Sequence, residues 1–67
     1  MKYPKNEIPW VSYKNKAGQV VCLITSNLKR DMYYLYEVAE NGDLKKIGRA
    51  HQPPDLVEKY QVFNRMN

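Results

Sequence analysis

The side chains that could do chemistry in this chain are few and scattered. His51 is the only histidine and Cys22 the only cysteine, so the chain cannot supply the roughly four ligands of a structural zinc site. Cys22 lies in the apolar run Val20–Ile24, and a nucleophilic cysteine needs a partner base and a polar, partly exposed setting. We therefore expect Cys22 to be a small core residue and His51 to be a solvated loop residue.

Motifs of covalent or phosphate chemistry are also missing from the sequence. Neither Ser12 nor Ser26 lies in a G-x-S-x-G elbow, and the three glycines are scattered singly rather than gathered in a phosphate-binding loop. Glu37 and Glu40 flank an expected hairpin turn, where cross-strand pairing with lysine explains them better than acid–base catalysis does. We expect no enzymatic activity, no cofactor, no metal and no small-molecule substrate.

The aromatic residues are the more informative group. Exposed rings interleaved with lysine and arginine allow small β domains to stack nucleic-acid bases. Tyrosine is equally a favoured strand residue that fills cores and protein interfaces, which is the competing interpretation. Neighbouring residues of a regular strand point to opposite faces, so the pair Tyr33–Tyr34 places at most one ring on a face without a helix. The aromatic residues are Tyr3, Trp10, Tyr13, Tyr33, Tyr34, Tyr36, Tyr60 and Phe63.

Size and composition indicate one small domain over residues 1–67. Eleven Lys and Arg against seven Asp and Glu give a formal charge of +4, a modest preference for a polyanionic partner. A single cysteine fits a reducing cytoplasm, and the first ten residues contain no apolar stretch typical of a signal peptide. The longest apolar run, Val20–Ile24, is far shorter than the roughly 20 residues of a membrane helix, so no membrane association is expected.

Four strands are predicted between an extended N-terminal arm (1–7) and a C-terminal helix. The first, 8–14, contains Pro9, which donates no ladder hydrogen bond and therefore favours a sheet edge. The second, 19–25, is apolar on both faces and rich in β-branched residues, which favours a central position. The third and fourth, 32–39 and 44–50, flank Asn41-Gly42, the strongest short-range hairpin signal.

The register of this last hairpin has two solutions. A two-residue turn at Asn41-Gly42 sets Glu37 opposite Lys46. A three-residue loop with a bulge at Gly42 sets Glu37 opposite Lys45, and it also pairs Leu35 with Ile47 and Val38 with Leu44. We favour the second register because it pairs apolar with apolar and charge with charge. Gly42 is then expected at positive φ.

A helix of about three turns is predicted over 55–64. Asp55 and Glu58 have the spacing of a capping box with Asp55 as the N-cap. Leu56, Tyr60 and Phe63 recur at i, i+4 and i+7, so they form one apolar stripe that should lie buried on the sheet. The predicted class is α+β: a four-stranded antiparallel meander (8–50) with this helix on one face. A small SH3-like or OB-like barrel is the alternative.

In an up-and-down meander, the loop 26–31, the start of the first strand and the end of the fourth meet at one end. This end, which we call the basic end, is the candidate surface for binding nucleic acid by an accessory or regulatory protein. The alternative is a protein–protein interaction module, with a homodimer as one form of it, that uses the edge strand 8–14 or the tyrosine-rich face. The basic end comprises Trp10, Lys29, Arg30, Tyr33, Tyr34, Arg49 and His51.

Overall fold

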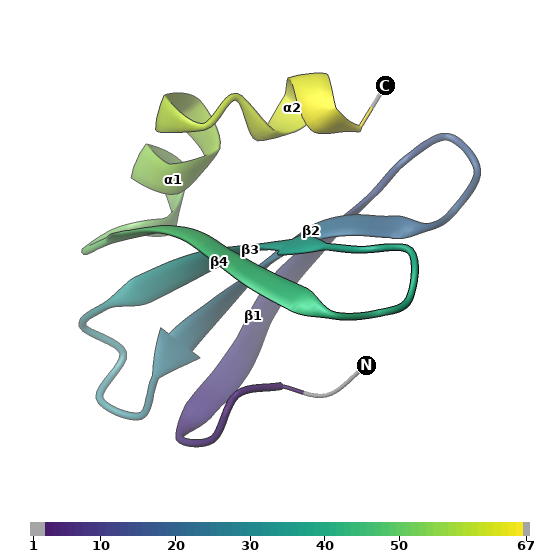
Figure 1. Cartoon of the computed structure of the whole chain (residues 1–67). Helices are drawn as coiled ribbons and strands as arrows, with labels where there is room; N and C mark the ends of the chain where they lie inside the picture. The colour runs from purple at the N-terminus through teal and green to yellow at the C-terminus, as the bar shows by residue number, and fades with distance from the viewer. Residues whose placement is uncertain (1–2, 67) are drawn as a thin grey trace.

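The fold is a single antiparallel sheet with two short helices on one face, given by a computed structural model that describes residues 3–66 (Figure 1). The strands follow one another in the order β1-β2-β3-β4, so the predicted meander is confirmed and the sheet is open, with β1 and β4 at its edges. The strands are β1 (Glu7–Lys14), β2 (Val20–Asn27), β3 (Tyr33–Val38) and β4 (Leu44–Ala50). Helices α1 (Pro53–Lys59) and α2 (Val62–Arg65) follow.

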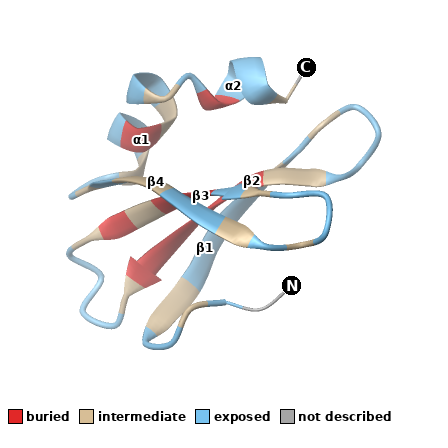
Figure 2. Cartoon of the chain, in the orientation of Figure 1, coloured by how far each residue is buried: buried red, intermediate tan, exposed pale blue. Residues whose placement is uncertain are grey.

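Strand β2 is the centre of the molecule, as its two-sided apolar pattern predicted. Its residues from Cys22 to Ser26 are all buried (Figure 2). The face toward the helices carries Cys22 and Ile24, which pack with Tyr33 and Leu35 of β3 and with the helical residues Leu56 and Val62. Leu23 and Thr25 point to the opposite face, where they are also buried.

The turns follow from their sequences. Asn15 closes the first turn by accepting hydrogen bonds from the backbone N–H groups of Ala17 and Gln19 through its side-chain oxygen. Gly42 has φ 91° in a loop closed by a hydrogen bond from Ala39 N to Asp43 O, so the expected positive φ is confirmed. In the described part of the N-terminal arm, a turn closed from Glu7 N to Pro4 O replaces extended chain; residues 1 and 2 lie outside the described range.

The preferred hairpin register is right next to the turn and wrong further along. Glu37 pairs with Lys45 and Val38 with Leu44, as predicted, but Leu35 pairs with Gly48 rather than with Ile47 because a bulge intervenes. A Cβ atom at position 48 would overlap the ring of Tyr60. The bulge therefore places Gly48, the only glycine of β4, beneath Tyr60, and Ile47 packs at the margin of the core.

The single predicted helix is wrong in both its start and its continuity. It begins two residues early, with Gln52 as N-cap and prolines in the first turn, so Asp55 is a first-turn residue and not the cap. Proline is favoured there because the first helical N–H groups have no intrahelical partner. The helix breaks at Gln61, which is left-handed with φ 50° and ψ 52°.

This break changes which residues face the sheet. Leu56 is buried as predicted and Tyr60 is half-buried, but Phe63 is 64% exposed and its neighbour Val62 is fully buried instead. The i, i+4, i+7 stripe assumed a continuous helix, and one left-handed residue rotates the following turn away from that register. The burial expected of Phe63 is therefore wrong.

Candidate functional site

The basic end is assembled as the meander topology required, but its residues do not share one surface. Lys29 and Arg30 are exposed in the β2–β3 loop, and the exposed His51 places its Nδ1 atom 3.2 Å from the Asp31 carbonyl oxygen across from that loop. Tyr34 pairs with the exposed Arg49 on the face away from the helices. Tyr33 points to the helix face, as strand alternation requires.

The rings of this end are largely occupied within the protein. Tyr33 is only 8% exposed, and Trp10 contacts it edge-on with ring centroids 5.2 Å apart. The Nζ atom of Lys46 lies 4.2 Å from the centroid of the Tyr34 ring, a cation–π contact that covers one face of the ring. Trp10, 48% exposed, is the ring of this set with the most free surface.

The face away from the helices is closed by a polar network that sequence reasoning missed. Glu7 Oε1 accepts hydrogen bonds from Thr25 Oγ1 at 2.6 Å and from the Tyr36 hydroxyl at 2.7 Å. Lys46 Nζ lies 3.8 Å from Glu7 Oε2. Burial, followed by the hydrogen bond to Glu7, raises the pKa of Tyr36 well above its ordinary value of 10.0. These groups satisfy one another, which makes this face a second packed layer rather than a free tyrosine surface.

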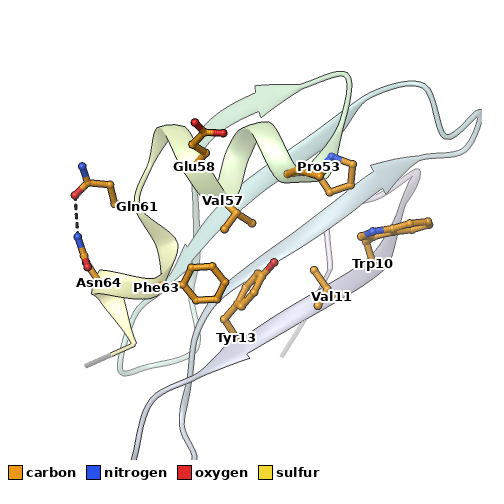
Figure 3. Close-up of a pocket in the computed structure, with 10 residues that line it drawn as sticks. Trp10, Val11, Tyr13, Pro53, Val57, Glu58, Gln61, Phe63 and Asn64 are labelled. Atoms are coloured by element: carbon orange, nitrogen blue, oxygen red, sulfur yellow. Dashed lines mark hydrogen bonds between the residues drawn. The ribbon is translucent and has the colours of Figure 1, made fainter.

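A mostly apolar hollow of the described chain lies on the other side, between β1 and the helices (Figure 3). We call it the β1–helix groove. It is open, encloses about 730 Å³, and is mostly apolar, a size within the usual range for ligand sites. Its lining residues are Trp10, Val11, Tyr13, Pro53, Pro54, Val57, Glu58, Gln61, Phe63 and Asn64.

A bulge in β1 directs Trp10 into this groove. Val11 pairs with Ile24 and Tyr13 with Cys22, so both project to the helix face. Regular alternation would send Trp10 to the opposite face. The register shifts between Pro9 and Val11, which leaves Trp10 as the extra residue of the bulge, and such bulges re-aim side chains. Trp10, Val11 and Tyr13 therefore all line one hollow.

The groove gathers apolar surface that is usually buried. Of the five large hydrophobic residues exposed in the described chain, Trp10, Val11 and Phe63 all lie here, with Leu28 and Tyr3 outside it. Phe63, which the helix break turns outward, meets the Tyr13 ring edge-on at a centroid distance of 6.2 Å. Single exposed hydrophobic residues are ordinary, but a concave cluster is typical of a binding site.

The electrostatics of the groove are simple. Glu58 is its only charged lining residue, while Gln61 and Asn64 are engaged with each other by a hydrogen bond of 2.9 Å from Asn64 Nδ2 to Gln61 Oε1. Desolvation, with a smaller contribution from Cys22, raises the pKa of the Tyr13 hydroxyl, so Tyr13 is a neutral hydrogen-bond donor at pH 7. The groove can therefore hold an apolar segment and one cation.

Other kinds of site find no support in residues 3–66. This part of the chain contains no group of three or more His, Cys, Asp or Glu able to hold a metal ion. Cys22 is fully buried, as predicted, and burial raises the pKa of its thiol. No helix among the described residues is long and apolar enough to cross a membrane.

Sequence reasoning placed Trp10 at a binding surface but missed its partners in the groove. Tyr13 is predicted only as an aromatic core or interface residue, without a location, and Phe63 is predicted to lie buried on the sheet rather than in a groove. The one available signal was Pro9 directly before Trp10, because proline in a strand marks an edge or a bulge. Comparison with known proteins adds nothing to this geometry: no family model, curated protein or solved structure matches the chain.

Proposed function

We propose that this protein is a non-enzymatic interaction module that binds an extended segment of a partner protein in the β1–helix groove. The observation that carries the proposal is the clustering of the exposed side chains of Trp10, Val11 and Phe63 in one concave, apolar surface. Covering these side chains with a partner removes apolar area from water, which is the main driving force of protein association.

The groove is a better binding surface than the bare strand edges. β1 carries Pro9 and a bulge at Trp10, and both features interrupt the ladder that an added strand would need. β4 carries a bulge and the exposed cations Lys45, Lys46 and Arg49, which also discourage edge-to-edge pairing. Binding through side chains in the groove avoids both obstacles.

Nucleic-acid binding is the second proposal, and one observation favours it. Lys29, Arg30 and Arg49 are exposed at the same end of the sheet, with Asp31 as the acidic residue beside them. A polyanion would bind there through phosphate contacts rather than base stacking, because Tyr33 is buried and the Lys46 ammonium already lies over the Tyr34 ring. Base stacking would then fall to Trp10 alone among the rings of the basic end.

A displayed library of random peptides tests the first proposal. Peptides are selected on the wild-type protein after nuclease treatment and then assayed on Phe63→Ala and Leu28→Ala. The two residues are matched, since Phe63 is 64% and Leu28 65% exposed, but Leu28 lies in the β2–β3 loop outside the groove. We expect selected peptides to lose binding to Phe63→Ala and to keep it on Leu28→Ala. Equal binding to all three proteins would overturn the proposal.

A further inference from the structure

Resting on the proposed function, we infer that the occupant of the β1–helix groove is a proline-rich segment in the polyproline II conformation with an arginine or lysine facing Glu58. Three features of the groove carry this inference: the spacing of its rings, the chemistry of its walls and its single charge.

The spacing of the rings matches the repeat of a polyproline II helix. Trp10 and Tyr13 lie three residues apart on β1; Tyr13 is on the helix face by alternation, and the bulge brings Trp10 to the same face. Three residues of a regular strand span roughly 10 Å, and a bulge shortens that span. A polyproline II helix repeats every three residues, with a rise of about 9 Å per turn. Successive turns of such a ligand would therefore meet Trp10 at one end of the groove and Tyr13 with Phe63 at the other (Figure 3).

The walls suit a ligand with flat apolar rings and free carbonyl groups. The groove is lined by aromatic rings and prolines, with Val11 and Val57 as its aliphatic members. Polyproline II backbone has no internal hydrogen bonds, so its carbonyls can accept bonds from a binding site. The Trp10 indole N–H and the Tyr13 hydroxyl are such donors, and the Tyr13 hydroxyl is directed toward the α1 side of the groove (Figure 3). A preformed polyproline helix also loses little conformational entropy on binding.

The charge selects the residue that flanks the prolines. Glu58 lies at the outer rim in α1 with its carboxylate directed to solvent, away from the rings (Figure 3). It has no ion-pair partner among the described residues. An acidic flank would meet this carboxylate with like charge, whereas arginine or lysine would pair with it. Because the pair is exposed, its contribution to affinity should be small and its contribution to orientation larger.

The intrinsic fluorescence of Trp10 provides the test, because it is the only tryptophan and lies inside the groove. The protein is titrated with three tryptophan-free peptides of equal length: about nine prolines followed by arginine, the same prolines followed by glutamate, and a glycine–serine repeat. We expect saturable binding of the first, about threefold weaker binding of the second, and no saturable signal with the third. Equal responses to the polyproline and glycine–serine peptides would overturn the inference.

Two matched pairs of variants locate the binding. Phe63→Ala should weaken the arginine-flanked peptide about tenfold, and Leu28→Ala should leave it unchanged. Glu58→Arg should reverse the preference between the two flanks. Glu40→Arg, which makes the same charge change in the β3–β4 loop, should not. All four positions are exposed, so circular dichroism should show an intact fold in every variant.

The outcomes separate this inference from the proposed function. If library peptides bind in a Phe63-dependent way but the polyproline peptides do not, the groove is a protein site and the polyproline assignment is wrong. If sedimentation shows Phe63-dependent self-association that displaces the peptides, the occupant is a second copy and the assignment is again wrong. If neither library nor polyproline peptides bind, both the assignment and the proposed function fall.

Discussion

Gly48 of β4 lies directly beneath Tyr60 of the C-terminal segment. The Tyr60 ring occupies the space that a Cβ atom would need. Gly48→Ala should therefore lower the free energy of unfolding by about 1–3 kcal/mol, the usual cost of overpacking, measured by urea denaturation. The same change made in a Tyr60→Ala background should cost much less, because the overlap is gone. An equal cost in both backgrounds would contradict the assigned contact.

Tyr36 couples stability to alkaline pH. Its pKa is raised from 10.0 in the folded state, mainly by burial, so the folded protein favours the neutral hydroxyl. The stability that the neutral Tyr36 hydroxyl contributes to the folded protein is fully present below pH 10 and is lost as pH rises through the folded-state pKa. At neutral pH, Tyr36→Phe should cost about 1–2 kcal/mol through the lost hydrogen bond to Glu7.

The gap between the two proteins should narrow above pH 10, because the phenylalanine variant lacks this titration. Unfolding by urea at a series of pH values measures the gap directly. If the difference in free energy of unfolding between the two proteins stays constant from pH 7 to well above pH 10, the pKa of Tyr36 is not raised in the folded state.

Residues with local determinants were predictable, and residues with distant partners were not. Gly42 follows from the turn that its neighbours impose, and Cys22 from the apolar run around it. Glu7 read as part of a polar arm, yet its carboxylate meets Tyr36, 29 residues away in the sequence. No local sequence pattern specifies this contact, because Glu7 on β1 and Tyr36 on β3 are separated by β2 and meet only once the sheet has formed.

At the scale of elements, the strands were predicted closely and the helix was not. Strand order, the edge position of β1 and the register next to the last turn follow from alternation and turn chemistry. The break at Gln61 has no such signal, because glutamine is an ordinary helix residue with no preference for the left-handed conformation. Tertiary packing of both Leu56 and Val62 against the sheet is what the break achieves.

The helix break at Gln61 determines which of two adjacent residues, Val62 or Phe63, packs against the sheet, and their substitution by alanine tests this. Val62→Ala removes fully buried methyl groups and should cost about 2 kcal/mol. Phe63→Ala removes a larger side chain that is mostly exposed, so its cost should stay within about 0.5 kcal/mol. Denaturant unfolding of both variants decides the matter. A larger cost for Phe63→Ala would restore the continuous helix predicted from the sequence stripe.

The groove is a property of elements that the sequence keeps apart. Its walls come from β1 near the N-terminus and from α1 and α2 at the C-terminus. Its formation needs two irregularities together, the bulge that redirects Trp10 and the helix break that exposes Phe63. Predictions from hydrophobic periodicity assume regular helices and strands. They therefore place Phe63 in the core and Trp10 at the basic end of the sheet, and neither residue in a groove.

At the scale of the whole molecule, the meander places six of the eleven Lys and Arg residues in two separated groups. Lys29, Arg30 and Arg49 lie at the basic end, whereas Lys14, Lys16 and Lys45 lie toward the other end, near the β1–β2 and β3–β4 turns. All six are exposed. The net charge of +4 attracts polyanions to the molecule in general, so a specific nucleic-acid surface must be shown by comparing one group with the other.

Replacing Lys29, Arg30 and Arg49 together by alanine should leave the fold intact and reduce the salt dependence of nucleic-acid binding by about one unit of slope per lost phosphate contact. The equal-charge variant with Lys14, Lys16 and Lys45 replaced by alanine is the control, and it should retain the wild-type slope. Fluorescence anisotropy with single- and double-stranded oligonucleotides at two salt concentrations measures both. Equal reductions of the salt-dependence slope in the two variants would indicate attraction by net charge alone.

If the wild-type protein binds no oligonucleotide at low salt, the nucleic-acid proposal is removed and the groove is left as the binding surface, because its apolar contacts do not depend on released counterions.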